Sequence, residues 1–143
     1  MSELGTWLHV KAAGRDLLLS TLDLREVVAP SPVAPLPGRP RGIQGVVIHQ
    51  GEFLPVLAWE DLPGCRKPSA APVALAVLRP RLGIPLERMV GLVDAWPEAW
   101  REPGEDDPTR SWTGSAGLID GKEVWLLDAE RLVGLLRRFR NER

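Results

Sequence analysis

The sequence predicts a mainly β fold, built as small barrels and ending in one α-helix. Three observations lead to this prediction. Short apolar runs recur along the chain, turn residues such as Gly, Pro and Asn or Asp separate them, and convincing helical periodicity occurs only near the C-terminus. With 143 residues, the chain is long enough for one domain or for two very small subdomains that share a core.

The N-terminal elements are a hairpin followed by a stiff connection. Apolar and polar residues roughly alternate over 7–11, and Gly14-Arg15 can turn the chain into a second strand at Leu17–Leu19. Residues 22–28 (LDLREVV) fit either a short helical turn or a strand. The segment 29–41 is rich in proline, which predicts an extended surface connection without ladder hydrogen bonds.

The middle of the chain contains the strongest strand pattern. Residues 43–49 and 53–57 are apolar and rich in β-branched side chains, and Gln50-Gly51-Glu52 joins them. Glycine at the join supplies the positive φ that a tight hairpin needs. Residues 59–71 are rich in Pro, Gly and polar side chains, so they are interpreted as a linker and a candidate subdomain boundary.

The second half repeats this organisation. The unbroken apolar run 73–78 predicts a strand buried on both faces, and 82–86 and 89–93 predict two more strands. Residues 95–109 hold several prolines and acids, so we expect an exposed excursion there.

A hairpin and a helix close the chain. Strands over 116–119 and 123–127 flank Asp120-Gly121, a sequence typical of a two-residue turn. Asp128 is expected to cap a helix from 129 to about 141. Its apolar face is formed by Leu132, Val133, Leu135, Leu136 and Phe139.

Composition and charge limit the possible partners. Hydrophobic residues make up 44% and charged residues 26%, and the formal net charge is -1, which argues against a binder of nucleic acid that relies on a strong basic field. The arginines at 137, 138, 140 and 143 are interpreted as cations that complement a helix dipole. The single Cys65, the absence of a signal-peptide pattern and the absence of a long apolar run favour a cytoplasmic protein without membrane insertion.

The sequence offers little for catalysis. His9 and His49 have no metal-type spacing with Cys65, and no Gly-x-Ser-x-Gly motif occurs. The glycine-rich run 114–117 lacks the lysine of a phosphate-binding loop, and the acids at 105–107 are interpreted as a solvated charge run. We therefore expect no catalytic residues, no metal and no cofactor, and hence a protein that is not an enzyme.

Six tryptophans in a chain without tyrosine point to binding of proteins as well as to core packing. They are Trp7, Trp59, Trp96, Trp100, Trp112 and Trp125. We expect Trp125 and one of Trp59 or Trp112 in the core, and any partly exposed tryptophan as an anchor for a protein partner.

Several segments occur in an order and at spacings that resemble one known family. They are 24–27 (LREV), 35–37 (PLP), 45–51 (GVVIHQG), 55–59 (PVLAW), 89–94 (MVGLVD), 117–121 (GLIDG) and 126–132 (LLDAERL). Together they resemble the CheW-like domain over nearly the whole chain.

The resemblance implies a single CheW-like domain over 1–143. It would hold two five-stranded barrels of the Src-homology-3 type side by side, over about 5–60 and 72–127, with a terminal helix over 128–141 and a groove between the barrels. The implied function is that of an adaptor in bacterial chemotaxis or motility. Such an adaptor couples the cytoplasmic tip of a chemoreceptor, near the groove, to a CheA-type histidine kinase at the end of the first barrel.

Matching positions imply partner-binding roles for Leu24, Glu26, Gly45 and Gln50. For Leu24 and Gly45 the alternative is packing or a required backbone geometry, and for Glu26 and Gln50 it is simple exposure. The hairpin departs from the family, which has Asn, Leu and Arg where this chain has Ile48, His49 and Gln50, and Asp where it has Ala58. The resemblance places that Arg in receptor coupling, and an amide does not replace a guanidinium conservatively.

Two other functions remain open at this point. The first is a diverged CheW-like adaptor of a pilus, surface-motility or other pathway that no longer couples a kinase. The second is a small β-barrel protein that binds single-stranded nucleic acid by stacking bases on its aromatic side chains.

Overall fold

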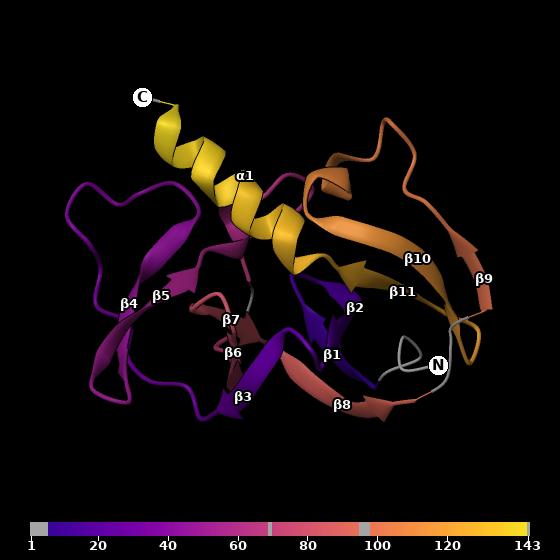
Figure 1. Cartoon of the computed structure of the whole chain (residues 1–143), viewed down its shortest axis with the longest axis horizontal. Coiled ribbons are helices and arrows are strands. Elements are labelled where there is room, and N and C mark those ends of the chain that lie inside the picture. The colour runs from indigo at the N-terminus through magenta and orange to yellow at the C-terminus, as the bar shows by residue number, and fades with distance from the viewer. Residues whose placement is uncertain (1–5, 69, 95–97, 143) are drawn as a thin grey trace.

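The chain folds into two β-sheets crossed by one helix. The computed structural model describes residues 6–68, 70–94 and 98–142, and the side chains of 98 and 99 are not described. Figure 1 shows the sheets side by side along the long axis, with the helix lying across both. The C-terminal end of the helix lies on the side of the sheet that contains β4 (Ile43–His49) and β5 (Glu52–Leu57).

One sheet has six strands, in the order β8-β1-β2-β11-β10-β9. Their bounds are β1 (Trp7–Ala12), β2 (Arg15–Ser20), β8 (Arg88–Val93), β9 (Glu98–Arg101), β10 (Thr113–Ile119) and β11 (Lys122–Leu127). All neighbours are antiparallel except β2 and β11, which run parallel with Leu17 opposite Trp125.

The other sheet has five strands, in the order β3-β6-β7-β5-β4. Their bounds are β3 (Leu24–Val28), β4 (Ile43–His49), β5 (Glu52–Leu57), β6 (Ala74–Leu78) and β7 (Leu82–Leu86). Two short 3-10 helices, η2 (Trp59–Asp61) and η3 (Pro108–Ser111), and the helix α1 (Ala129–Asn141) complete the described elements.

The prediction of a mainly β fold with a C-terminal helix is confirmed, but closed barrels are not found in the strand pairing of the described residues. The sheets also do not follow the expected halves 5–60 and 72–127. β1 and β2 pair with β8 and β11 from the second half, while β6 and β7 join β3, β4 and β5. Apolar runs predict where strands form, but several partners are compatible with the same run, so pairing depends on the tertiary fold.

Both tight hairpins form as predicted. Gln50 and Gly51 join β4 to β5 with φ of 53° and 76°, and Asp120 and Gly121 join β10 to β11 with φ of 51° and 77°. Positive φ at both central residues suits the right-handed twist of the flanking strands.

Two connections contain more structure than predicted. Within the proline-rich segment, Ala34 exchanges both backbone hydrogen bonds with Val46 of β4, at 2.8 and 2.9 Å. The expectation of no ladder hydrogen bonds was wrong there, because Ala34 keeps the N–H that its proline neighbours lack. The excursion over 95–109 likewise includes β9 and the first residues of η3.

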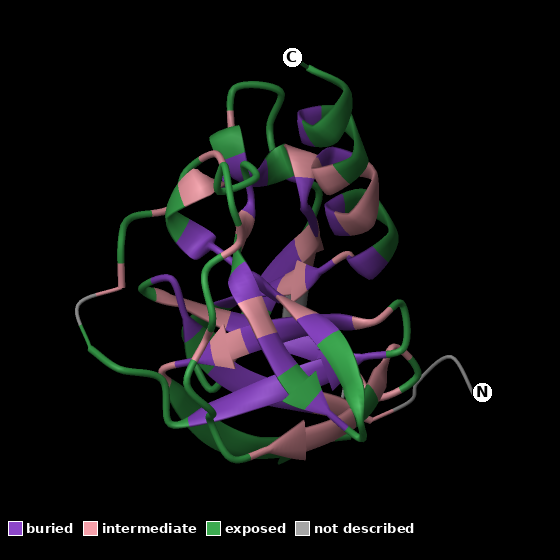
Figure 2. Ribbon diagram, turned by 90° about the vertical axis from the view of Figure 1, so that its left-hand side faces the viewer, coloured by how far each residue is buried: buried purple, intermediate pink, exposed green. Residues whose placement is uncertain are grey.

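A shared core joins the two sheets and the helix. Its members come from strands of both sheets, from η2 and from α1. Figure 2 shows buried residues concentrated in the strands and on the inward side of the helix, while most loops are exposed. A smaller cluster of Val47, Leu54, Val56, Leu75 and Val77 fills the five-stranded sheet.

Three tryptophans lie in this core. Trp59 and Trp112 pack edge to face with ring centroids 5.6 Å apart. Their indole N–H groups donate to the carbonyl oxygens of Pro85 and Pro63 at 2.8 and 2.9 Å. Trp125 is also buried, so the core holds both candidates, Trp59 and Trp112, where one was expected. Trp96 lies outside the described residues.

The helix begins at the predicted cap. The Asp128 carboxylate accepts a hydrogen bond from the Arg131 backbone N–H at 2.9 Å, which satisfies one of the free donors of the first turn. Leu132, Leu135 and Phe139 are buried on the inward face.

We predict that Asp128→Ala lowers the free energy of unfolding by about 1 kcal/mol, because the first turn loses its cap. Asp128→Asn keeps a side-chain oxygen and is the control, with an expected change below about 0.5 kcal/mol. Urea denaturation measures both variants. Equal losses in the two would contradict a capping role.

Candidate partner-binding surface

A polar cluster joins β3 to the end of the β4–β5 hairpin. The His49 Nε2 lies 2.8 Å from the Glu26 Oε2, and the Gln50 side-chain amide donates to the same oxygen at 3.1 Å. The Arg25 guanidinium donates to the Gln50 Oε1 at 3.3 Å. An ionised carboxylate only accepts hydrogen bonds, so the imidazole proton facing Glu26 is on Nε2.

This polar cluster bridges the two edges of the five-stranded sheet. β3 and β4 are at opposite ends of the strand order, yet Glu26 on one contacts His49 on the other. The sheet is therefore curled so strongly that side chains span the gap that a backbone ladder would close in a barrel. His49 is buried, and its Nδ1 has no hydrogen-bond partner among the described residues.

An apolar patch lies on the outer face of the same hairpin. Ile48 pairs with Phe53 and Val46 pairs with Pro55 across the two strands. Ile48 is 63% exposed and Phe53 is 70% exposed, although both are large apolar side chains. We call these four residues the hairpin patch. Such exposed apolar groups, with an aromatic at the centre, are typical of protein-binding surfaces.

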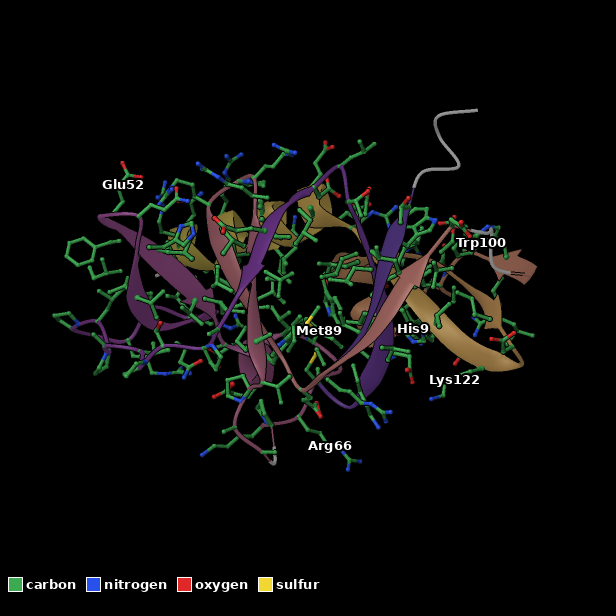
Figure 3. The ribbon with its side chains drawn as sticks, turned by 90° about the horizontal axis from the view of Figure 1, so that it is seen from below. His9, Glu52, Arg66, Met89, Trp100 and Lys122 are labelled. Atoms are coloured by element: carbon green, nitrogen blue, oxygen red, sulfur yellow. The ribbon has the colours of Figure 1, made fainter. Side chains whose placement is uncertain are left out.

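A second apolar surface lies on β8. This strand is at the edge of the six-stranded sheet, and Met89, Val90 and Leu92 along it are 43%, 50% and 70% exposed. We call these residues the β8 strip. An edge strand leaves backbone groups free to pair with another chain. Figure 3 shows Met89 between Glu52 at one end of the molecule and Trp100 at the other.

The structure brings two of the four predicted site residues together. Glu26 and Gln50 are hydrogen-bonded to each other in the polar cluster. Leu24 is half-buried and packs against the shared core. Gly45 is buried, and a Cβ there would lie 2.2 Å from the carbonyl oxygen of Ala34. Packing therefore accounts for Leu24 and close backbone approach for Gly45, while partner binding by all four remains a prediction.

The residues that the sequence analysis missed are Phe53 and the β8 strip. The sequence carried an indication of Phe53, because alternation along β5 places it on the face opposite Leu54 and Val56. For β8 the apolar run predicted a strand, but it did not show that the strand would lie at a sheet edge with its side chains exposed.

Both histidines form pairs with carboxylates. His9 contacts Asp16 at 2.9 Å in the six-stranded sheet, whereas His49 contacts Glu26 in the five-stranded sheet. In the ranges described, no group of three or more His, Cys, Asp or Glu side chains is arranged to hold a metal ion. None of the described helices is long and apolar enough to cross a membrane.

Three groups have shifted pKa values. Burial and the nearby Asp128 raise the pKa of Asp23, and Arg79 partly offsets this. Burial also acts to raise the pKa of Asp107, but hydrogen bonds from Thr109 and the charges of two arginines outweigh it and lower that pKa. Burial raises the pKa of the Cys65 thiol to about 11.

Comparison with known proteins agrees with this architecture. The family model of the CheW-like domain matches residues 6–137. The chain belongs to the CheW-like domain family. A solved structure of the scaffolding protein TtCheW from Thermoanaerobacter tengcongensis is similar to this CheW-like chain, with a TM-score of 0.77 and 16% identity over 90% of this chain and 86% of that one. No curated protein sequence matches the chain.

We predict that Gly45→Ala lowers the free energy of unfolding by about 2 kcal/mol, because the added methyl group must displace the backbone of Ala34. Gly104→Ala is the matched control, since a Cβ at that position meets nothing within 4 Å, and we expect a change below about 0.5 kcal/mol. Urea denaturation measures both, and an equally small effect at Gly45 would contradict the close approach.

We predict that Cys65 is alkylated by iodoacetamide about 100-fold more slowly in the folded chain at pH 8 than in 6 M guanidinium chloride, because the thiolate is the reacting form. The folded pKa of about 11 exceeds the ordinary value of 9.0, so thiolate is scarcer in the folded state at this pH. Mass spectrometry over time gives both rates. Similar rates would show that Cys65 is not protected.

Proposed function

We propose that this chain is a cytoplasmic, non-catalytic adaptor that couples the tip of a chemoreceptor to a CheA-type histidine kinase. The observation that carries this proposal is the hairpin patch beside the polar cluster. The cluster contains Glu26 and Gln50, which occupy positions where the family resemblance implies contact with partners. The β4–β5 hairpin carries the patch and also joins the polar cluster through His49 and Gln50, which suits recognition of a protein.

The composition of this region supports binding of a protein. Ile48 and Phe53 supply exposed apolar side chains for one partner. Arg25, Glu26 and Gln50 supply polar groups for a second partner. The side-chain hydrogen bonds hold the polar groups in place, so less conformational freedom is lost when a partner binds.

Two separate apolar surfaces allow two partners to bind at once. The hairpin patch belongs to the five-stranded sheet, and the β8 strip belongs to the six-stranded sheet nearer the middle of the molecule (Figure 3). We assign the hairpin patch to the kinase, because the resemblance implies binding at that end of the fold. We assign the β8 strip, together with Glu26 and Gln50, to the receptor tip.

Arg25 lies close to position 50, where this chain has Gln in place of the arginine of the family. The family has an arginine where this chain has Gln50, yet the Arg25 guanidinium lies against the Gln50 amide at 3.3 Å. A positive charge is thus present close to the position from which the family arginine would act. This supports receptor coupling by a rearranged pair of residues.

A second candidate is a diverged adaptor of a pilus or surface-motility pathway that does not couple a kinase. The observation that favours it is Ile48, which exposes an apolar side chain where the family has Asn. A pull-down with the regulatory domain of the cognate kinase separates the two candidates. No retention at high micromolar concentration would favour the diverged adaptor.

The alternative of a nucleic-acid binder has little support among the described residues. Trp59, Trp112 and Trp125 are buried and offer no face for a base to stack on. Titration with single-stranded DNA and RNA at low salt tests it, because stacking would quench tryptophan fluorescence.

We predict that Phe53→Ser weakens binding of the kinase regulatory domain about tenfold, because it removes the aromatic centre of the hairpin patch. Leu92→Ser on β8 is the matched control, since both side chains are 70% exposed, and we expect less than a twofold change. Isothermal titration calorimetry measures both affinities, and thermal unfolding checks that both variants remain folded. Equal losses would contradict the assignment of the kinase to the hairpin.

A further inference from the structure

A groove lies between the end of the proline-rich segment and the outer side of α1. Its volume is about 540 Å³. It is lined by residues 37–41 and 43 on one side and by six residues between 133 and 142 on the other. We call it the arginine groove. In Figure 1 the loop before β4 and the C-terminal half of α1 lie on the same side of the molecule.

The walls of the groove are held at a fixed distance by Gly42. Its φ is +89°, and a Cβ there would lie 2.5 Å from the Leu136 Cδ2 and 3.0 Å from the Phe139 ring. The Gly42 backbone N–H also donates to the Asp61 carboxylate at 2.8 Å. The loop is thus seated on the helix at one side and tied to η2 at the other, so the groove is preformed.

The groove combines an apolar lining with excess positive charge. Ile43, Val133 and Leu136 are half-buried and contribute the apolar part. Arginine supplies four of the lining side chains, at positions 39, 41, 137 and 140, whereas the lining holds one acid, Glu142. This combination differs from the hairpin patch, where the exposed residues are apolar and uncharged.

Two of these arginines have acidic partners among the described residues. Arg39 lies 3.2 Å from Asp61, and Arg41 lies 3.3 Å from Glu142, with its guanidinium 3.9 Å from the Phe139 ring centroid. Neither Arg137 nor Arg140 has an acidic partner in the part of the chain that the structure describes. Both are exposed at the rim.

The helix dipole accounts for only part of this charge. Cations near the end of α1 complement the dipole, as the sequence analysis inferred. Arg39 and Arg41 come from a separate segment, but Glu60, Asp61 and Glu142 offset their charges. The positive charge without an acidic partner among the described residues therefore comes from Arg137 and Arg140, beside the apolar lining. Positive charge beside an apolar hollow matches a ligand that carries both negative charge and an apolar group.

We propose that the arginine groove binds an acidic segment of a partner protein, which inserts an apolar side chain between the loop and α1. Its carboxylates would pair with Arg137 and Arg140, in the charge-assisted geometry that guanidinium favours. Nucleic acid fits the site less well, because Arg41 already covers the Phe139 ring on which a base would stack. This surface goes beyond the proposed coupling function, since its lining shares no residue with the hairpin patch or the β8 strip.

The test is a titration of the full ¹⁵N-labelled chain with a synthetic peptide of sequence Glu-Glu-Asp-Leu-Phe-Glu-Asp-Glu. We expect shifts of backbone amides in 38–43 and 133–142, and weaker binding as salt is raised. The same peptide with lysine at every acidic position is the control and should not bind. No shifts at millimolar acidic peptide, or shifts confined to other regions, would overturn the proposal.

A pair of neighbouring variants isolates the groove. Arg137→Glu reverses a charge in the lining and should weaken binding of the acidic peptide about tenfold. Arg138→Glu makes the same change one residue further along, on a face that lines a different hollow, and should alter it less than twofold. Equal effects would overturn the proposal. So would binding of a dodecamer of thymidine at Arg137 that is tighter than binding of the peptide.

Discussion

The contact between Trp59 and Trp112 is the interaction on which the two-sheet arrangement depends. Trp59 lies two residues after the end of β5 in the five-stranded sheet, and Trp112 immediately precedes β10 in the six-stranded sheet. Their rings meet edge to face, and each indole N–H is satisfied by a carbonyl oxygen from the β7 region or from the linker. Two small sheets that would be marginal alone therefore share one core, which α1 completes.

This arrangement leaves apolar side chains exposed on two edge strands. β4 and β8 are both edge strands, and each carries exposed apolar side chains that the core does not require. A shared core fixes the distance between these surfaces, as the proposed binding of two partners would require. The polar cluster adds a local constraint, because Glu26 ties β3 to the hairpin and keeps the five-stranded sheet curled.

Membership of the CheW-like domain family is consistent with a molecule that offers exposed side chains for binding on its surface. The described histidines pair with carboxylates, and the half-buried thiol of Cys65 is held protonated at neutral pH by its raised pKa. In the hairpin, His49 and Gln50 both contact the Glu26 carboxylate. The arginine groove lies elsewhere and would extend the set of partners without disturbing that hairpin.

The sequence by itself determined the elements whose causes are local. Gln50-Gly51 and Asp120-Gly121 placed both hairpins, and Asp128 placed the start of α1, because turn and cap chemistry acts within a few residues. Only the tertiary structure decided that β1 and β2 join β8 and β11, that Gly45 lies under Ala34, and that His49 meets Glu26. Those contacts join residues that are separated in the sequence, and the pattern of apolar residues does not determine which strands pair with each other.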